Sequence, residues 1–105
     1  MLEEIDVVTL KNKIDANEKF KIIDIRESEE VSICKINNTI HIPMMEIPKR
    51  VSELGLKKDI AVMCHSGVRS AQVCSFLEKK GYSVFNVMGG INMWSVEVDK
   101  EMNKY

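Results

Sequence analysis

The chain has 105 residues, which is the size of one domain and long enough to bury a hydrophobic core of its own. Hydrophobic residues make up 45% of the chain and charged residues 30%, proportions that exclude a disordered tail or a coiled coil. Lys and Arg together number 15 against 16 Asp and Glu, so the net charge is −1. This balance argues against broad electrostatic capture of nucleic acid or of an anionic membrane, although a local anion site is compatible with it.

Cysteine usage and the amino-terminal residues indicate the compartment. The first residues contain neither the basic nor the apolar run of a signal peptide, and no apolar stretch approaches the length of a membrane span. Three cysteines, Cys34, Cys64 and Cys74, form an odd number without CxxC spacing. We therefore expect reduced thiols and a cytoplasmic location. The histidines and cysteines do not have tetrahedral metal-ligand spacing, so we expect neither a metal site nor a cofactor.

Strand and helix patterns alternate along the chain. Short β-branched runs are typical of buried strands, and amphipathic stretches closed by glycine are typical of helices. The expected elements are, in chain order, a strand over 4–8, a helix over 10–16 capped by Thr9, a strand over 20–25, a helical turn over 27–31, an extended segment over 40–42, a helix over 47–54 ending at Gly55, a strand over 60–63, a helix from about Ser70 to Lys80 followed by Gly81, a strand over 83–87, a Gly89-Gly90 turn and a helical turn over 91–95.

This alternation favours an α/β fold with a central parallel sheet flanked by helices on both faces. We expect a single domain over residues 1–105, with a core of about 5–95 and a polar, frayed tail over 99–105. Sites in such sheets lie beyond the carboxyl ends of the strands. Cys64 directly follows the apolar strand over 60–63 and is therefore the main candidate for a catalytic residue.

The loop that begins at Cys64 combines a nucleophile with an anion cradle. Gly67 allows the backbone to curl and to point several N–H groups inward, and the following helix adds its positive end. A thiol in this place has a lowered pKa and forms a thiolate without a general base. The candidate substrate-binding residues are His65, Ser66, Gly67, Val68 and Arg69.

A buried, inert cysteine is the alternative for Cys64, because free cysteines often pack as small apolar residues. The Ser-Gly-x-Arg-Ser run and the helix start after Cys64 favour the functional interpretation. His65 need not face the sulfur of its neighbour, so we interpret it as a residue that lines the loop rather than a base.

Six motifs over about residues 5–94 resemble the rhodanese sulfurtransferase domain, in the order found in that family. They are Ile23-Asp-Ile-Arg26, Glu29-Glu30, Ile40-His-Ile-Pro43, Cys64-His-Ser-Gly-Val-Arg-Ser70, Gly81-Tyr82 and Gly89-Gly-Ile-x-x-Trp94. The resemblance implies a single rhodanese-like domain and a double-displacement reaction in which the cysteine carries a persulfide.

The length of the cysteine loop distinguishes between related chemistries. Relatives of this fold that act on phosphate or arsenate resemble tyrosine phosphatases in having five residues between the cysteine and the arginine, whereas four lie between Cys64 and Arg69. The tighter ring favours sulfur transfer. Many family members that use thiosulfate carry an arginine directly after the cysteine, and His65 in that place is expected to capture this dianion more weakly. The segment 34–39 departs from the family pattern, and its Asn37-Asn38 pair is suited to a turn.

Three further residues are expected to support the loop. Asp24 and Arg26 lie at the carboxyl end of the strand over 20–25, where Asp24 could accept loop N–H groups and Arg26 could add to the fold or to the field at the substrate. A local ion pair that closes the strand is the interpretation we favour for both. Ser70, which ends the motif that begins at Cys64, is the third of these residues.

The remaining large or reactive side chains have structural interpretations. Cys74 is assigned to the apolar face of its helix, Cys34 to a solvent-facing position and Trp94 to the core as an apolar plug.

The sequence therefore predicts a rhodanese-type thiosulfate sulfurtransferase that acts through a Cys64 persulfide. Its expected partners are a small sulfur donor and a nucleophilic acceptor, which is cyanide, a thiol or a protein cysteine. We expect the protein to be a monomer or a weak dimer. A sulfur-carrier or interaction module with little or no catalysis is the alternative. Phosphatase or arsenate reductase chemistry ranks third.

Overall fold

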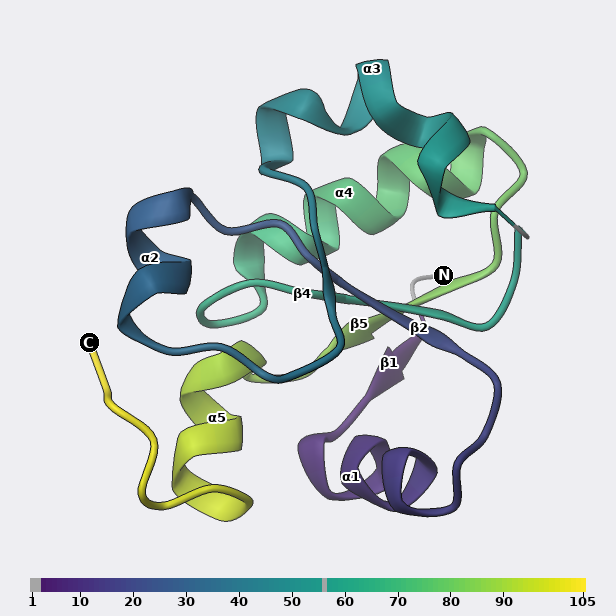
Figure 1. Cartoon of the computed structure of the whole chain (residues 1–105). Helices are drawn as coiled ribbons and strands as arrows, with labels where there is room; N and C mark the ends of the chain where they lie inside the picture. Colours follow the sequence, from purple (N-terminus) through teal and green to yellow (C-terminus); the bar gives the residue numbers. More distant parts are fainter. Residues whose placement is uncertain (1–2, 56) are drawn as a thin grey trace.

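Five parallel strands form one sheet in the computed structural model, which describes residues 3–55 and 57–105. The spatial order is β1-β5-β4-β2-β3, so β4 lies in the centre (Figure 1). Because all neighbouring pairs are parallel, the carboxyl ends of the strands meet at one edge. The strands are β1 (Glu4–Ile5), β2 (Lys21–Asp24), β3 (Ile40–His41), β4 (Ile60–Met63) and β5 (Val84–Val87).

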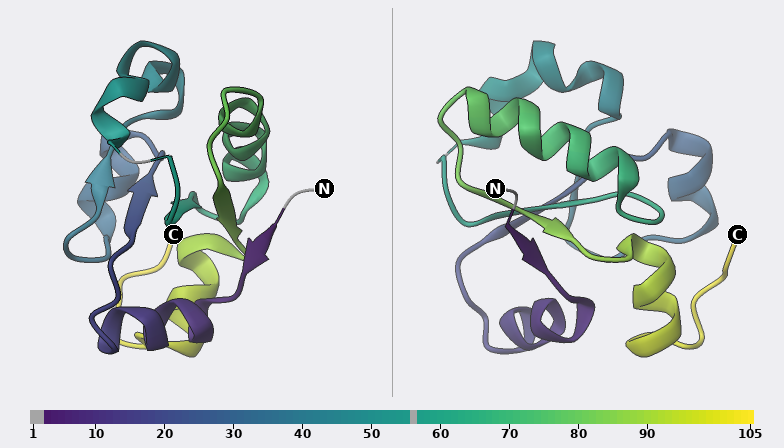
Figure 2. Two further views of the ribbon diagram at one scale, coloured as in Figure 1. Left: turned by 90° about the vertical axis from the view of Figure 1, so that its right-hand side faces the viewer. Right: turned by 180° about the vertical axis from the view of Figure 1, so that it is seen from behind.

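Helices cover both faces of this sheet, which confirms the expected α/β architecture. Figure 2 shows α3 and α4 on one side of the strands and α1 and α5 on the other. The helices are α1 (Val7–Asp15), α2 (Ser28–Ile33), α3 (Ile47–Arg50), α4 (Val68–Lys79) and α5 (Gly90–Glu97), with 3₁₀ turns η1 (Met44–Glu46) and η2 (Val51–Leu54) on either side of α3.

The alternation of side chains along β4 creates two hydrophobic clusters. Ile60 and Val62 pack with the α4 residues Val73 and Leu77, whereas Ala61 and Met63 pack with α1 and α5, because successive side chains of a strand point to opposite faces. Cys64 continues this alternation and lies on the α4 side. Trp94 is buried in the α1 and α5 cluster, as expected.

The amino-terminal elements differ from the expectation. The expected strand over 4–8 ends at Ile5, and α1 begins at Val7. Asp6 caps this helix, since its Oδ1 accepts the amide of Thr9 at 2.7 Å. Thr9 is therefore the third residue of the helix and not its cap. An aspartate at the N-cap satisfies an amide that has no partner within the helix.

Other element boundaries also shift. The expected turn over 27–31 is the six-residue α2, and the expected helix over 47–54 is divided into α3 and η2. α4 begins at Val68, two residues earlier than expected, because Gly67 already serves as its N-cap. α5 begins at Gly90 and extends to Glu97, so it is longer than the expected turn. In the segment 34–39, Asn38 adopts a positive φ of 64°, in agreement with the expected turn.

The tail after Val98, for which the sequence suggested fraying, makes tertiary contacts in the structure. Met102 packs against the α1 and α5 cluster, and the Tyr105 ring stacks on His65 with 4.2 Å between ring centroids. The sequence pattern did not indicate this, because a polar segment without periodicity gives no sign of a tertiary contact. In Figure 1 the tail runs from the end of α5 toward α2.

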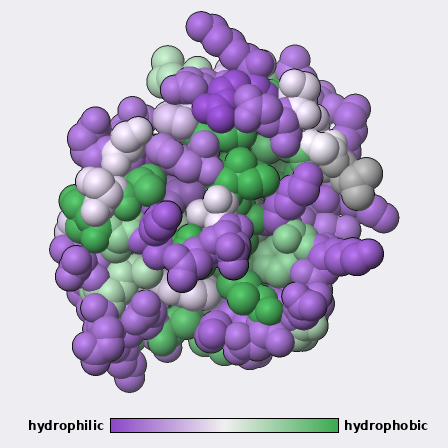
Figure 3. All heavy atoms as spheres, in the orientation of Figure 1, coloured by the Kyte–Doolittle hydropathy of each residue, from purple (hydrophilic) through white to green (hydrophobic). Residues whose placement is uncertain are grey.

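The surface is mixed in polarity. On the face drawn in Figure 3, hydrophilic residues predominate and hydrophobic residues form small separate groups. None of the helices in the described part of the chain combines the length and the apolar character that a membrane crossing requires.

Candidate active site

Cys64 lies immediately after the central strand β4, at the edge where the carboxyl ends of the strands meet. The residue is 1% exposed. Its Sγ accepts the amide of Gly67 at 3.1 Å and the amide of Ser70 at 3.4 Å, and lies 3.3 Å from the Ser70 hydroxyl oxygen. The first turn of the twelve-residue α4 supplies the Ser70 amide, so the sulfur lies where the helix attracts negative charge.

The pKa of Cys64 lies below its ordinary value. Burial alone raises the pKa of this thiol, but the hydrogen bond between the sulfur and the Ser70 side chain, together with those from the amides of Ser70, Gly67 and Ser66, outweighs burial. The amide donors favour the charged form of the sulfur. The loop therefore supports a thiolate at a pH where an ordinary cysteine is protonated.

Two glycines allow the loop to close around the sulfur. Gly67 has a φ of 104°, a backbone conformation that residues other than glycine rarely adopt. Gly90 lies so close to the loop that an added Cβ would collide with the carbonyl oxygens of Cys64 and His65. The next residues of α5 bind these same carbonyls, since Ile91 N donates to Cys64 O at 2.9 Å and Asn92 N donates to His65 O at 3.0 Å.

Asn86 on β5 is a site residue that the sequence reasoning missed. Its Oδ1 accepts the Ser70 hydroxyl, and its Nδ2 donates to Gly67 O at 3.1 Å. The side chain is 3% exposed and shares the sheet face of Cys64. The signal that could have found it is a polar residue inside the apolar run of 84–87, since a buried amide needs partners.

Arg69 lies on the rim of the site and is paired with Glu30 of α2. Its Nη1 and Nη2 bind the two carboxylate oxygens at 2.8 and 2.7 Å. Arg69 lowers the pKa of Glu30 to about 2, and Glu30 raises the pKa of Arg69. The sequence reasoning quoted Glu30 only as part of a motif, and the contact between α2 and α4 that gives it a role had no sequence signal.

The other loop residues differ in their orientation. Val68 is 66% exposed, and Ser66 is also exposed, so these residues contribute backbone rather than side chains to the cradle. His65 is half-buried and stacks on Tyr105. The structure therefore brings Cys64, Gly67 and Ser70 together at the sulfur and places His65 and Arg69 on the rim.

Asp24 and Arg26 form a buried ion pair. The Arg26 guanidinium binds Asp24 Oδ2 at 2.8 Å, and both side chains are at most 1% exposed. Asp24 Oδ1 also accepts the Arg26 amide at 3.1 Å. In the described part of the chain, the Asp24 carboxylate is thus used by Arg26 rather than by amides of the cysteine loop. The pair closes β2, as favoured from the sequence.

Arg26 also binds backbone carbonyls in α2 and in the segment that follows α2, and so links them to β2. Its guanidinium donates to the carbonyl oxygens of Glu30 and Cys34, at 3.2 and 2.8 Å. Cys34 is half-buried, and its Sγ lies 3.9 Å from Arg26 Nη1, so the expected solvent-facing position is wrong. The cause is the carbonyl bond to Arg26, which draws the backbone inward. Cys74 packs in the α4 cluster as expected, and burial raises the pKa of its thiol to about 12.

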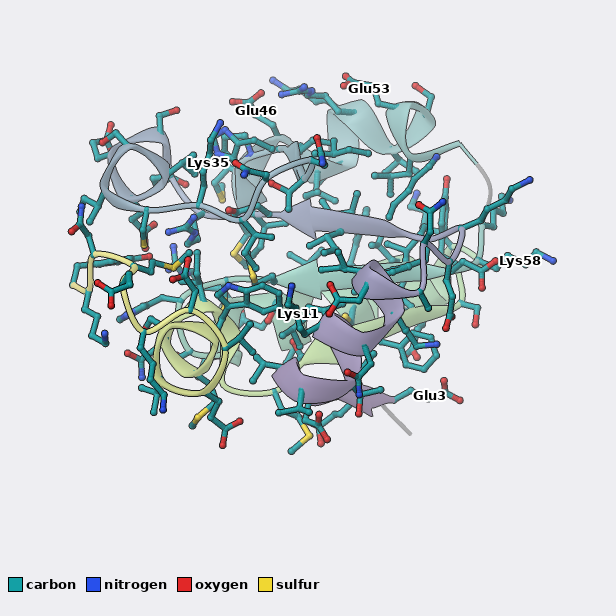
Figure 4. All side chains as sticks on the ribbon, turned by 60° about the horizontal axis from the view of Figure 1, so that its bottom comes forward. Glu3, Lys11, Lys35, Glu46, Glu53 and Lys58 are labelled. Carbon is teal, nitrogen blue, oxygen red and sulfur yellow. The ribbon has the colours of Figure 1, made fainter. Side chains whose placement is uncertain are left out.

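A groove of about 530 Å³ lies away from Cys64, between α1, the segment after α2, and α5. Trp94, Phe20 and Ile36 are among its lining residues, and the two lysines that line it, Lys11 and Lys35, are labelled in Figure 4. None of its lining residues belongs to the loop 64–70, so the groove is separate from the reactive sulfur.

The geometry defines a class of protein. A small, all-parallel α/β domain that holds a cysteine of lowered pKa between its central strand and a helix N-terminus has the groups that nucleophilic chemistry requires. The family model of the rhodanese-like domain matches residues 6–97. The chain belongs to this family.

Individual relatives agree with this assignment. The protein YtwF of Bacillus subtilis is named as a sulfurtransferase by expectation. It is 40% identical to this chain over 96 residues, which are 91% of this chain and 93% of YtwF. YrkF of the same organism is named as a sulfur carrier protein by expectation. It is 37% identical to this chain, and the match covers 90% of this chain and 51% of YrkF. The crystal structure of a rhodanese-like domain protein from Staphylococcus aureus superposes with a TM-score of 0.83 at 34% identity, covering 89% of this chain and 91% of that one.

Proposed function

We propose that the chain is a sulfurtransferase of rhodanese type in which Cys64 carries a sulfane sulfur as a persulfide. The observation that carries the proposal is the Cys64 sulfur itself, which accepts the amides of Gly67 and Ser70 at the start of α4 and has a lowered pKa. Membership of the rhodanese-like family and the likeness to YtwF support sulfur transfer as the general activity.

In the first step, the Cys64 thiolate attacks the outer sulfur of a donor such as thiosulfate. A sulfur–sulfur bond forms at Cys64 while the sulfur–sulfur bond of thiosulfate breaks, and sulfite leaves with that electron pair. No net oxidation occurs and no proton is needed, because the nucleophile is already ionised. The product is a Cys64 persulfide, whose outer sulfur extends from the cradle toward the mouth of the loop.

In the second step, a nucleophilic acceptor attacks this outer sulfur. Cyanide then becomes thiocyanate, or a thiolate becomes a persulfide, and the Cys64 thiolate is released with the electron pair of the broken bond. The same amides that bind the thiolate stabilise it as a leaving group. The reduced thiols that this cycle needs agree with the cytoplasmic location expected from the sequence.

The loop side chains have distinct roles in this proposal. Arg69 places positive charge at the mouth, although Glu30 neutralises much of it. His65 occupies the position after the cysteine without adding a fixed charge. We therefore expect weak capture of thiosulfate and propose that persulfide-bearing donors of lower charge compete with it. Asp24 and Arg26 support the segment behind the site.

A sulfur carrier is the second candidate, favoured by the likeness to YrkF. The two functions share the persulfide and differ in turnover. A carrier would form the persulfide stoichiometrically and release the sulfur quickly only to a protein thiol, whereas a sulfurtransferase would turn over with thiosulfate and cyanide. Steady-state thiocyanate formation, compared with single-turnover transfer to a protein thiol, distinguishes them.

Mass spectrometry after incubation with thiosulfate tests the shared step. The wild type and Cys34→Ser are expected to gain the mass of one sulfur atom, and Cys64→Ser is expected to gain nothing. Cys34→Ser is the matched control, because it removes a half-buried thiol outside the loop. Equal labelling of wild type and Cys64→Ser would contradict the proposal. Hydrolysis of an aryl phosphate that depends on Cys64, without sulfur uptake, would assign the site to phosphatase chemistry instead.

A further inference from the structure

The carboxyl-terminal tail returns to the cysteine loop. After α5 the chain turns at 99–101, and Met102 is half-buried against the α1 and α5 cluster. From this anchor, residues 103–105 extend toward α2, where Asn103 Nδ2 reaches the Ile33 carbonyl at 3.4 Å. In Figure 1 the tail ends at the side of the molecule where the loop between β4 and α4 lies.

The Tyr105 side chain connects the two ends of the loop 64–70. Its ring stacks on His65, the residue after Cys64, at 4.2 Å and an angle of 19°. Its hydroxyl donates to Glu30 Oε1 at 3.0 Å, and Glu30 holds Arg69 with both carboxylate oxygens. Tyr105 thus contacts His65 at the start of the loop directly, and it contacts Arg69 at the end of the loop through the Glu30 carboxylate.

The hydroxyl of Tyr105 has a complete set of partners. It accepts Arg26 Nη1 at 3.0 Å while it donates to Glu30. It therefore joins the buried Asp24–Arg26 pair to the Glu30–Arg69 pair on the rim. Such a matched donor and acceptor arrangement indicates a specific contact rather than a tail lying at random on the surface.

The contact has features of a reversible cover. Tyr105 remains 38% exposed, and residues 103–105 form neither helix nor strand, so their release breaks side-chain contacts without unfolding a helix or a strand. In the described part of the chain, His65 Nε2 is buried without a hydrogen-bond partner. A buried polar nitrogen without a partner is unfavourable, and Tyr105 stacks on the ring that carries this nitrogen.

We propose that residues 103–105 form a cover over the mouth of the Cys64 loop and that Tyr105 is a specificity-determining residue that selects reaction partners by size. The cover in place restricts Cys64 to small donors such as thiosulfate. A protein that brings a thiol to the persulfide occupies the place of Tyr105 between His65 and Glu30. The identity of these reaction partners rests on the proposed sulfur transfer, whereas the cover itself does not.

Thiol modification with reagents of two sizes tests the cover on the full chain. The rates at which iodoacetamide and a maleimide carried on a polyethylene glycol chain modify Cys64 are measured by mass spectrometry of the Cys64 peptide. Three variants release the cover to different degrees: Tyr105→Phe keeps the stacking ring and loses the hydroxyl, Tyr105→Ala loses both, and a chain ending at Met102 loses the segment. Lys104→Ala is the control, because the Lys104 ammonium contacts only the exposed Lys100 carbonyl in the described part of the chain.

The expected result is a change in the ratio of the two rates. The ratio of bulky to small reagent rises about fivefold or more in Tyr105→Ala and in the shortened chain, rises less in Tyr105→Phe, and stays at the wild-type value in Lys104→Ala. The pH midpoint of the iodoacetamide rate stays unchanged, because the cover alters access to the sulfur and not its affinity for a proton.

Two results would overturn the inference. One is an unchanged ratio in all Tyr105 variants. The other is an equal rise of both rates with a shifted pH midpoint, which would mean that Tyr105 acts on the thiol and not on access. Neither reagent requires sulfur transfer, so a chain that fails to form a persulfide but shows the ratio change would disprove the proposed function and leave the cover standing.

Discussion

The Ser70 hydroxyl donates to Asn86 Oδ1, and the two residues are sixteen positions apart in the chain. This bond fixes the hydroxyl oxygen 3.3 Å from the Cys64 sulfur. β5 therefore takes part in the site through Asn86, although the cysteine loop itself is formed by β4 and α4.

Ser70→Ala is expected to raise the pKa of Cys64, because the hydrogen bond between the sulfur and the Ser70 side chain is the largest of those that lower it. Modification of Cys64 by iodoacetamide at neutral pH should slow about three- to twentyfold, since one hydrogen bond to a charged group contributes about 1.5–3 kcal/mol and the more basic thiolate is a better nucleophile, which offsets part of the loss. Rates measured across a pH series give the midpoint. Ser75→Ala, on the exposed side of α4, is the control, and an identical midpoint in Ser70→Ala and Ser75→Ala would refute the role of the hydroxyl.

Glu30→Gln is expected to reduce stability in a pH-dependent way. The pKa of Glu30 is lowered from 4.5 to about 2, so its stabilising contribution is present above pH 4.5 and is lost as the pH falls toward 2. Because the pair with Arg69 is partly exposed, we expect a difference on the order of 1 kcal/mol at pH 7. Urea unfolding of both proteins at several pH values measures it. Glu29→Gln, on the exposed neighbour, should show no such trend, and a difference that persists undiminished at pH 2 would contradict the assignment.

Gly90→Ala and Gly81→Ala separate steric collision from backbone strain. Both glycines have positive φ, 57° and 91°, so alanine at either costs about 1 kcal/mol of backbone strain. At Gly90 the added carbon meets the Cys64 and His65 carbonyls, while at Gly81 no atom of residues 3–55 and 57–105 lies within 4 Å. We expect Gly90→Ala to lose about 3 kcal/mol or more and to slow Cys64 modification, and Gly81→Ala to leave Cys64 unchanged. Equal unfolding free energies of the two variants would show that the loop tolerates the displacement.

The Asp24–Arg26 pair is expected to be strongly coupled. Arg26→Met leaves the Asp24 carboxylate buried without its partner and should cost about 3–5 kcal/mol of unfolding free energy. The double variant Asp24→Leu/Arg26→Met should be less destabilised than Arg26→Met alone, because it removes both charges. A double-mutant cycle by urea unfolding measures the coupling. Additive single effects would indicate that the two residues act independently.

The sequence predicted the parts of this molecule that depend on local pattern. The five strands, the parallel α/β arrangement and the position of Cys64 follow from β-branched runs and from a cysteine placed after one of them. The helix start at Val68 was missed by two residues, because Gly67 serves as N-cap through its backbone and no capping side chain marks the place. Asn86 and Tyr105 were missed because their contacts join segments far apart in the chain, and no periodicity records such contacts. Asp6 was missed as a cap because the apolar residues around it suggested a longer strand.

The first described residues lead into the outer strand β1, whereas the carboxyl-terminal tail returns to the cysteine loop. Glu4 lies on the outer strand β1 and pairs with Asn86, and Tyr105 lies beside the loop that follows β4. A fluorescent label or purification tag added after Tyr105 would therefore crowd the entrance to the sulfur and disturb every rate described above.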